Sequence, residues 1–164
     1  MSEQVRYRSP TIHNVESAAR CHMECWREAY TGLVPRERLA ALLSIERFRD
    51  LWQRMIMEGR QVTIAVDQDS VIGFANAGSA WEPGVNVDVQ LFAINVRQSY
   101  WGTGVGQRLL DEAIGDREAF LWMFRDNARA RAFYVRNGFQ PDGAERTEPF
   151  LGPVEIRLVR RRVP

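Results

Sequence analysis

The spacing of hydrophobic residues changes along the chain from a helical period to a strand period. In residues 11–30 and 35–59 apolar side chains recur every three or four positions, which predicts two helical regions. Between residues 61 and 96 they alternate with polar side chains or run together, which predicts strands. A helical period returns at 104–115, and further strands follow. This order of elements indicates an α/β or α+β fold built on a mixed sheet.

The expected elements can be placed from these periods and from the turn residues between them. The run AFLWMF at residues 119–124 is apolar throughout, which is typical of a strand buried on both faces and often parallel to its neighbours. Residues 35–59 form either one helix or two short ones, and Thr11 or Asn14 can cap the first helix. Strands are expected at residues 4–10, 61–66, 71–78, 87–96, 119–124, 139–146 and 153–160, and helices at 11–30, 35–59, 104–115 and 126–138.

The composition is that of a globular protein with one domain. The 164 residues are 45% hydrophobic and 26% charged, and no linker or repeat divides them, so residues 1–164 are expected to form a single domain. The net charge of +1 gives no general attraction to nucleic acid or to an anionic membrane. All 22 basic residues are arginine. Apolar runs are too short for a membrane span and the N-terminus is polar, so we expect a cytoplasmic protein.

Two cysteines and two histidines near the N-terminus raise the question of a metal site. On a helix Cys21 and Cys25 share one face, whereas His22 points about 100° away from Cys21. His13 would have to fold back onto the same helix, and the spacing matches no standard zinc motif. We therefore favour two buried free thiols over a metal site, and expect no metal.

The stretch YWGTGVGQRLLDEA contains three glycines at every second position before a predicted helix. Gly102, Gly104 and Gly106 leave backbone N–H groups bare, and the positive end of the helix points to the same place. The first acidic residue of the helix is Asp111, which leaves its first turn to an anion brought by a ligand. A Walker loop needs lysine, and a dinucleotide loop needs glycine where Gln107 stands, so both are excluded. A phosphate cradle and a merely flexible loop both remain.

The predicted helix at 126–138 carries a second group of residues with useful chemistry. Asn127 and Tyr134 are seven positions apart, and so share one face of the helix with Ala130 between them. The phenol can donate or accept a proton, and the amide can pair with an amide of an extended ligand. The alternative is an amphipathic core helix with Asn127 as its N-cap and Gly138 just past its end.

Together these two segments resemble the GCN5-related N-acetyltransferase (GNAT) family, in which acetyl-coenzyme A donates an acetyl group to an amine. The family's phosphate motif, Gln/Arg-x-x-Gly-x-Gly/Ala, is similar to the run that begins at Trp101: Gly104 and Gly106 match, and Trp101 replaces the leading Gln or Arg. The family's second motif, Asn-x-x-Ala-x-x-Phe-Tyr-x-x-x-Gly-Phe, is matched by Asn127, Ala130, Phe133, Tyr134, Gly138 and Phe139. The resemblance covers nearly the whole chain.

The resemblance implies a fold and a cofactor site. The fold is the acyl-CoA N-acyltransferase (GNAT) fold, a central mixed sheet of six to seven strands with about four helices and with splayed parallel strands at the cofactor. The strand end would pair with the pantetheine arm, and the glycine loop would bind the pyrophosphate. The residues implied for acetyl-CoA are Ile94, Asn95, Val96, Gly102, Thr103, Gly104, Val105, Gly106, Gln107, Asn127, Ala130 and Phe133. The adenosine 3′-phosphate would meet one of Arg97, Arg108, Arg129 and Arg136, among which the sequence does not choose.

The resemblance also implies direct attack of a neutral amine on the thioester in a ternary complex. Tyr134 would lie near the sulfur and protonate the leaving thiolate. Some family members have a glutamate base where this chain has Trp122 and Met123. Asp88, on the strand before the phosphate loop, is the leading candidate for the base, and a water relay or an amine that arrives neutral needs no base.

The acceptor would be an amine of a small molecule, a peptide or a protein. Trp26, Tyr30, Trp81 and Glu82, with the loop at 148–150, are the candidates for its pocket, because aromatic rings and acids suit a cationic amine. Core packing is an equally good explanation for Trp26. An acyl-CoA-binding sensor or regulatory domain without turnover is the alternative function, and the retention of a phenol for the thiolate argues against it. The resemblance also allows a homodimer.

Overall fold

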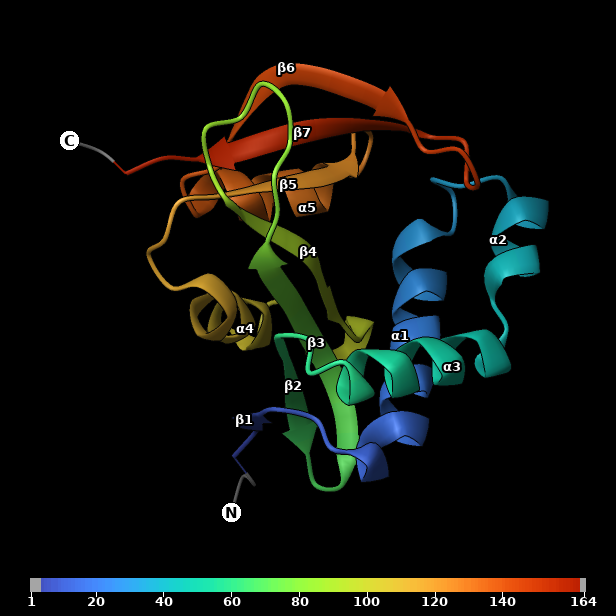
Figure 1. Ribbon diagram of the computed structural model, residues 1–164. Helices are drawn as coiled ribbons and strands as arrows, with labels where there is room; N and C mark the ends of the chain where they lie inside the picture. The colour runs from blue at the N-terminus through green and yellow to red at the C-terminus, as the bar shows by residue number, and fades with distance from the viewer. Residues whose placement is uncertain (1–3, 163–164) are drawn as a thin grey trace.

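One seven-stranded mixed sheet forms the centre of the molecule, and helices cover both of its faces (Figure 1). The computed structural model describes residues 4–162. The strand order across the sheet is β1-β2-β3-β4-β5-β7-β6. All seven strands that the hydrophobic spacing predicts are present. They are β1 Arg6–Arg8, β2 Val62–Asp67, β3 Ser70–Ser79, β4 Val89–Val96, β5 Ala119–Phe124, β6 Gln140–Thr147 and β7 Val154–Arg160.

The helices also lie where the spacing predicts them. They are α1 Val15–Tyr30, α2 Arg36–Leu42, α3 Ile45–Met57, α4 Val105–Ile114 and α5 Ala128–Arg136, with short 3-10 turns η1 Ile12–Asn14 and η2 Gln98–Tyr100. Residues 35–59 form two helices rather than one, because Ser44 starts a new helix by capping the Arg47 N–H. The Asn14 side chain does not cap α1; it accepts a hydrogen bond from the Thr11 N–H at 2.9 Å. Across the described residues, none of the helices combines the length and apolar character needed to cross a membrane.

The pairing of β5 differs in part from the prediction. β5 is parallel to β4, but it is antiparallel to β7, which runs along its other edge. The expectation of parallel neighbours is therefore right on one side and wrong on the other. The reason is that an apolar run reports burial of both faces of a strand and does not determine the direction of each neighbour.

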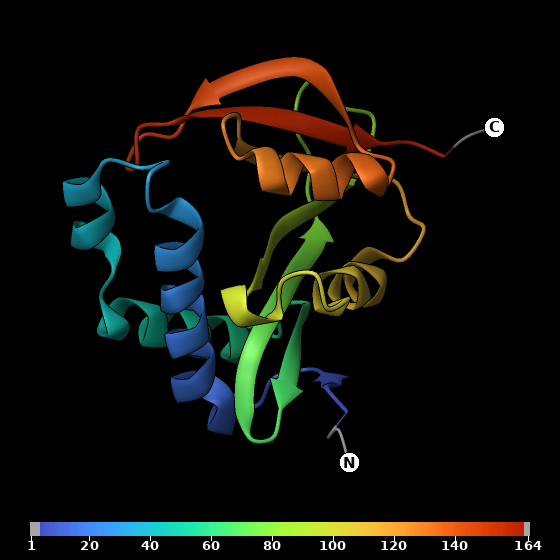
Figure 2. The ribbon, with the colours of Figure 1, turned by 180° about the vertical axis from the view of Figure 1, so that it is seen from behind.

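β4 and β5 pair only near their amino ends, where Gln90 is opposite Phe120. Against β3, the register of β4 shifts between Leu91 and Ala93, which leaves Phe92 as the extra residue of a β-bulge. A bulge bends its strand and interrupts the ladder. Beyond it, β4 has no further register pair with β5, and the sheet opens between its β1–β4 half and its β5–β7–β6 half (Figure 2).

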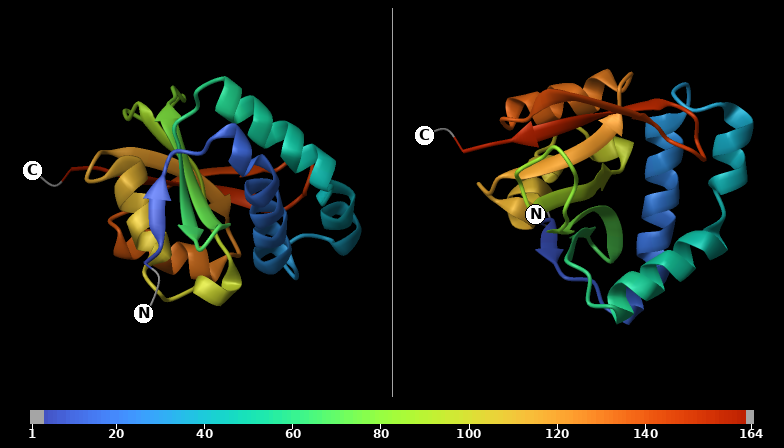
Figure 3. Two further views of the ribbon diagram at one scale, coloured as in Figure 1. Left: turned by 90° about the horizontal axis from the view of Figure 1, so that it is seen from below. Right: turned by 45° about the horizontal axis from the view of Figure 1, so that its top comes forward.

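The two faces of the sheet carry different helices. α1 and α3 pack on one face through a large apolar cluster, and α4 and α5 pack on the other. Over β5 and β7, residues 80–88 take the position that α1 has over the other half (Figure 3, right). Val85 and Val87 of this segment pack against Phe120 and Val159.

Gly73 of β3 allows α4 to lie close to the sheet. A Cβ at this position would be 2.9 Å from the Asn95 carbonyl oxygen and 3.2 Å from Leu109 Cδ1 of α4. Any larger residue would therefore push α4 away from the strands. The position of α4 matters for the site because the glycine stretch leads directly into it.

His22 is a buried, neutral residue of the α1 core. It is 6% exposed, and its Nδ1 accepts a hydrogen bond from Trp52 Nε1 at 3.2 Å. Burial lowers the pKa of His22 to about 3. Cys21 and Cys25 beside it are free and buried, as the sequence predicts. Within residues 4–162, no three side chains of the metal-ligating types come together.

We predict that His22 makes the protein less stable below pH 6.5. The pKa of this imidazole is about 3 in the folded protein and 6.5 without perturbation, so between these values the unfolded chain binds a proton that the folded chain does not. The stability that the neutral His22 contributes is therefore fully present above pH 6.5, and it is lost as the pH falls from 6.5 toward 3. Compared with His22→Asn, the native protein should lose about 2 kcal/mol more unfolding free energy between pH 7 and pH 5. Urea unfolding at both pH values measures this, and an equal loss in the variant would contradict it.

Candidate functional site

A cleft of about 440 Å³ lies where the sheet opens, between the end of β4, the glycine loop and α5. This volume is in the usual range for small-molecule sites. Most of the residues that the sequence implies for acetyl-CoA, together with Tyr134, line it. The full set is Ile94, Val96, Tyr100, Trp101, Gly102, Gly104, Gly106, Gln107, Arg129, Ala130, Ala132, Phe133, Tyr134 and Arg136.

The glycine loop presents bare backbone to the cleft. Gly102 and Gly104 have φ values of +75° and +92°, and a Cβ at either position would meet nothing within 4 Å. Within residues 4–162, no backbone carbonyl pairs with the N–H of Gly102 or with the N–H groups from Gly104 to Gln107. α4 has no acidic residue in its first turn and no side-chain cap. Free N–H groups and the positive end of a helix therefore point toward one place, which is the arrangement that binds anions.

Trp101, the residue that departs from the family motif, is held firmly beside this loop. Its indole Nε1–H donates to the Val96 carbonyl at 2.8 Å, at the end of β4. The Cζ atom of Arg129, from α5, lies 3.3 Å from the centroid of the indole. Trp101 therefore contacts both walls of the cleft.

α1 and β2 hold the segment that leads into the glycine loop. Glu28 of α1 accepts hydrogen bonds from Arg97 Nη2 at 3.0 Å and from the Gln98 N–H at 2.7 Å. The Tyr100 hydroxyl donates to Asp67 at 2.5 Å. Sequence reasoning missed Glu28 and Asp67, because an isolated acid on a helix or at a strand end looks like an ordinary exposed residue. No local pattern connects them to a loop so far along the chain.

Side-chain hydrogen bonds join α4 to α5 at the cleft. Gln107 Nε2 donates to Asn137 Oδ1 at 2.8 Å, and Asn137 Nδ2 donates to the Phe133 carbonyl at 2.9 Å. Asn127 caps α5, since its Oδ1 accepts from the Ala130 N–H at 3.1 Å. The N-cap interpretation of Asn127 is confirmed, and its side chain is not among those that line the cleft.

Tyr134 presents a protonated phenol to the cleft. Burial raises the pKa of Tyr134 to about 12, while the nearby charge of Arg129 acts in the opposite direction. The phenol therefore keeps its proton at neutral pH and is available as a donor. Phe133 and Phe139 pack edge-on against its ring, with centroids 5.4 Å and 5.7 Å away, which fixes its position.

The sheet surface of β5 and β7 that faces away from α5, here called the far face, holds a second group of side chains. Trp122 and Phe124 share this face because they are two positions apart on β5. Arg157 and Glu155 of β7 lie directly opposite them in the antiparallel register, and so point to the same side. Glu82 reaches the far face from the segment that crosses it, and its two carboxylate oxygens accept from Trp122 Nε1 at 3.0 Å.

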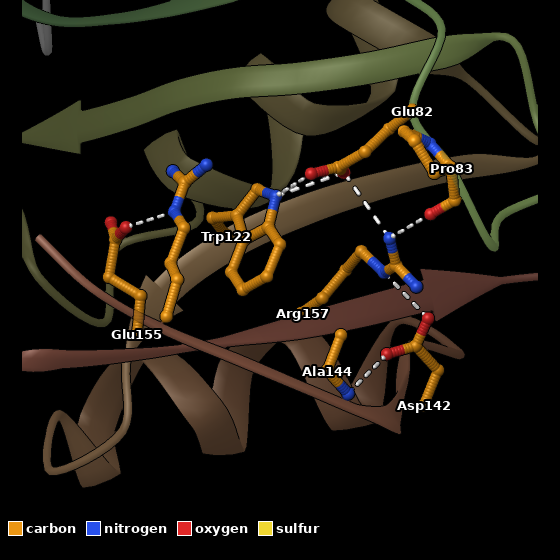
Figure 4. Close-up of polar contacts among 8 residues, drawn as sticks. Glu82, Pro83, Trp122, Asp142, Ala144, Glu155 and Arg157 are labelled. Atoms are coloured by element: carbon orange, nitrogen blue, oxygen red, sulfur yellow. Dashed lines mark hydrogen bonds and ion pairs between the residues drawn. The ribbon is translucent and has the colours of Figure 1, made fainter.

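A buried arginine fixes that segment to the far face (Figure 4). Arg157 is 7% exposed. It donates to Asp142 at 2.6 Å and to the Pro83 carbonyl at 3.0 Å, and it lies 3.5 Å from Glu82. A buried charge is tolerated only with such partners. The position of Glu82 is therefore determined by a network that spans three strands and a loop.

Tyr30, at the end of α1, reaches the far face beside the opening in the sheet. Its ring centroid is 4.9 Å from that of Phe124. Burial raises the pKa of Tyr30, and the neighbouring Tyr134 and Glu155 raise it further. Because Tyr134 belongs to α5, on the other face, the two phenols lie on either side of the opening between β4 and β5.

The other acceptor candidates are placed differently. Trp26 packs against His22 and Phe48, with ring centroids 5.5 Å and 5.4 Å away, in agreement with the core-packing interpretation. Trp81 is 83% exposed and Phe150, on the loop after β6, is 74% exposed. Of the four predicted acceptor residues, Tyr30 and Glu82 reach the far face, and Trp26 packs beside Tyr30 against the Phe124 cluster, with their ring centroids 5.5 Å apart.

Some residues implied for the cofactor or for catalysis do not line the cleft. Asn95 continues the pairing of β4 with β3, and Val105 is buried in the core beneath α4. The Thr103 hydroxyl donates to a backbone carbonyl of its own turn. Asp88 is exposed and precedes β4, at the end of the strand away from the opening. The structure therefore does not bring Asp88 and Tyr134 together.

Of the four arginines that were candidates for the 3′-phosphate, two are paired with glutamates and two line the cleft. Arg97 and Arg108 form ion pairs with glutamates of α1 and α4, at 3.0 Å and 2.7 Å. Arg129 and Arg136 line the cleft. The cleft therefore carries positive charge from α5 in addition to the helix ends.

Comparisons with known proteins agree with this geometry. A family profile described as "Acetyltransferase (GNAT) domain" matches residues 58–141. The chain is 27% identical over 130 residues to the uncharacterized N-acetyltransferase YuaI of Bacillus subtilis strain 168, with 75% of this chain and 73% of that protein covered. It is 26% identical over 170 residues to a probable N-acetyltransferase of Mycobacterium tuberculosis, with 97% and 93% covered.

A solved structure supports the fold. The PaiA N-acetyltransferase from Thermoplasma acidophilum, in complex with coenzyme A, superimposes with a TM-score of 0.74 at 18% identity, and the match covers 97% of this chain and 99% of that one. The segment that matches the family profile runs from the end of α3 to the start of β6, and so includes the glycine loop and the helix with Tyr134. The chain therefore belongs to the GNAT family, and it is an acetyl-CoA-dependent N-acetyltransferase.

Proposed function

We propose that acetyl-CoA lies along the cleft with its thioester at the opening between β4 and β5, and that a cationic amine reaches it from the far face. One observation carries this proposal: the bare glycine loop and the Tyr134 phenol line the same cleft, where the sheet opens. A bare loop at a helix N-terminus suits phosphates, and a protonated phenol suits a leaving thiolate.

In this arrangement the pyrophosphate binds the N–H groups of Gly102 and of residues 104–107, and the pantetheine arm runs along the end of β4. The Val96 carbonyl already accepts a hydrogen bond from Trp101, so the arm pairs with the remaining backbone groups of Ile94 and its neighbours. Asn127 contributes by shaping the first turn of α5, because its own side chain is used as the cap.

The reaction is direct transfer between the two bound substrates. The lone pair of the neutral amine forms a bond to the thioester carbonyl carbon, the C–S bond breaks, and the amine loses one proton. The protein accelerates this by holding the reactants together and by aiming N–H groups at the carbonyl oxygen. The pKa of Tyr134, about 12, is higher than that of an ordinary thiol, about 8.5. Its O–H therefore stabilises the departing thiolate chiefly as a hydrogen-bond donor.

The far face favours a positively charged acceptor. The chain's own Arg146 occupies this surface as a cation would: its Nε is 2.6 Å from Glu155, and its Cζ is 4.2 Å from the centroid of Trp122. Glu82 adds a second carboxylate at the same indole. An alkylammonium group that takes the place of the Arg146 side chain would meet the same ring and carboxylate, and would bind by charge and by cation–π attraction.

The general base, the oligomeric state and the cellular location are predicted from the sequence alone. Asp88 has no support from its position, and an acceptor that arrives as a neutral amine needs no dedicated base. Residues 1–164 are proposed to form one N-acetyltransferase domain, because a single sheet contains strands from Arg6 to Arg160. A homodimer and a cytoplasmic location are kept as predictions.

Ligand binding and turnover provide the first test. Acetyl-CoA at about 100 times its Kd should stabilise the protein by roughly 2.7 kcal/mol, seen as a higher Tm. Thiol release should then be measured over polyamines, aminoglycosides, amino acids, peptides with a free N-terminus and lysine peptides, and we expect turnover with polycationic amines first. A missing Tm shift would contradict the proposed site, and a shift without thiol release from any of these amines would favour the sensor alternative.

Tyr134→Phe tests the phenol. The variant should lower kcat by about 100-fold, because it removes the donor to the thiolate, while the Kd for acetyl-CoA stays within about twofold. Tyr7→Phe, on β1 and outside the cleft, is the matched control and should be fully active. Native activity in Tyr134→Phe would remove the residue from the mechanism.

Glu155→Gln tests the acceptor surface. Loss of the carboxylate should raise the KM for a cationic amine by about tenfold, because a charge-assisted hydrogen bond contributes about 1.5 kcal/mol or more. The Kd for acetyl-CoA should not change, since the cofactor lies on the other side of the sheet. Glu145→Gln, an exposed residue of β6, is the control. An unchanged amine KM would show that Glu155 does not contact the acceptor.

A further inference from the structure

Trp101 stands at the position where the phosphate motif of the family begins with Gln or Arg, and its orientation is determined by the structure. The indole N–H donates to the Val96 carbonyl, which leaves the flat face of the ring as its remaining contact surface. That face is covered by the guanidinium of Arg129, 3.3 Å from the ring centroid. The uncharged Trp101 thus holds the positive charge of Arg129, which comes from α5.

Arg129 lies where a cation is electrostatically unfavourable without an anion. It is the second residue of α5, and the first turn of this helix contains no acidic residue to offset the positive end of the helix. Burial lowers the pKa of Arg129, and within residues 4–162 no carboxylate is paired with its guanidinium. Arg97 and Arg108, by contrast, have glutamate partners.

The stacked geometry leaves the binding atoms of Arg129 free. A guanidinium that lies flat on an aromatic ring uses its face, whereas its N–H donors project from the edge in the plane of the group. These donors suit the paired oxygens of a phosphate. The glycine loop next to Trp101 adds N–H groups without carbonyl partners, so both sets of donors meet in one cleft.

We propose that Trp101 and Arg129 form one functional unit, in which the indole holds the guanidinium beside the glycine loop so that it binds the pyrophosphate of acetyl-CoA. The unit replaces the side chain that the motif has lost at position 101. This inference rests on the proposed placement of acetyl-CoA in the cleft. It assigns to Arg129 a role at the pyrophosphate, which is distinct from that of a surface charge near the 3′-phosphate.

The test is a double-mutant cycle read out as Kd by calorimetry, with Arg129→Gln, Trp101→Gln and the double variant. The ligands are acetyl-CoA, its 3′-dephospho form and S-acetylpantetheine, which has no phosphate. Arg129→Gln should weaken both nucleotide ligands by about 10- to 100-fold and leave S-acetylpantetheine unchanged. In the Trp101→Gln background the same change should weaken them by less than about threefold, because the guanidinium is no longer held there.

Controls separate this inference from the proposed function and from misfolding. Arg131→Gln, on α5 but outside the cleft, should bind like the native protein. Trp101→Leu also removes the aromatic face but keeps an apolar side chain, so it provides a second route if Trp101→Gln does not fold. Equal losses in both backgrounds, no loss in Arg129→Gln, or a loss confined to acetyl-CoA would each overturn the inference. Failure of the native protein to bind acetyl-CoA would instead contradict the proposed function.

Discussion

The incomplete pairing of β4 with β5 is the constraint on which the rest of the site depends. A continuous ladder would separate α5 from α1 completely. A bulge at Phe92 interrupts the pairing of β4 with β3 and bends β4. β4 and β5 share a single register pair, and the unpaired ends leave an opening through the sheet. The Tyr134 phenol lies on one side of this opening and that of Tyr30 on the other. The glycine loop follows the unpaired end of β4 after one short 3-10 turn, so the proposed phosphate site and the opening are products of the same departure from regular pairing.

Much of this arrangement could be predicted from local sequence. The periods of apolar residues located every strand and helix, because each period reports which face of an element is buried. The glycines at 102, 104 and 106 indicated bare backbone before a helix, and Asn127 proved to be the N-cap of α5. The local pattern does not contain the direction of neighbouring strands: the run AFLWMF reports burial and not the direction of β7. It also left open whether residues 35–59 form one helix or two, which one capping hydrogen bond at Ser44 decides.

The residues that sequence reasoning missed are those that act over long separations. Glu28 holds the entry to the glycine loop from α1, and Arg157 fixes the segment around Glu82 from β7. Glu155 reaches the far face because the register of β7 places it opposite Phe124. Each looks like an ordinary charged residue in its own stretch. Trp101 is the reverse case: its departure from the motif was visible, but its partner Arg129 was not, because the two meet only after α5 folds back over the loop.

The sheet also divides the protein into two parts that can change separately. The cofactor cleft is built by β4, α4 and α5, whereas the far face is bounded by α1, residues 80–88 and the loop after β6. In the proposed arrangement, substitutions in the second group alter the surface that meets the amine without touching the groups that hold acetyl-CoA. Selection can therefore exchange one acceptor for another while the donor half of the reaction is inherited intact. A new specificity requires changes in a few loops and no redesign of the fold.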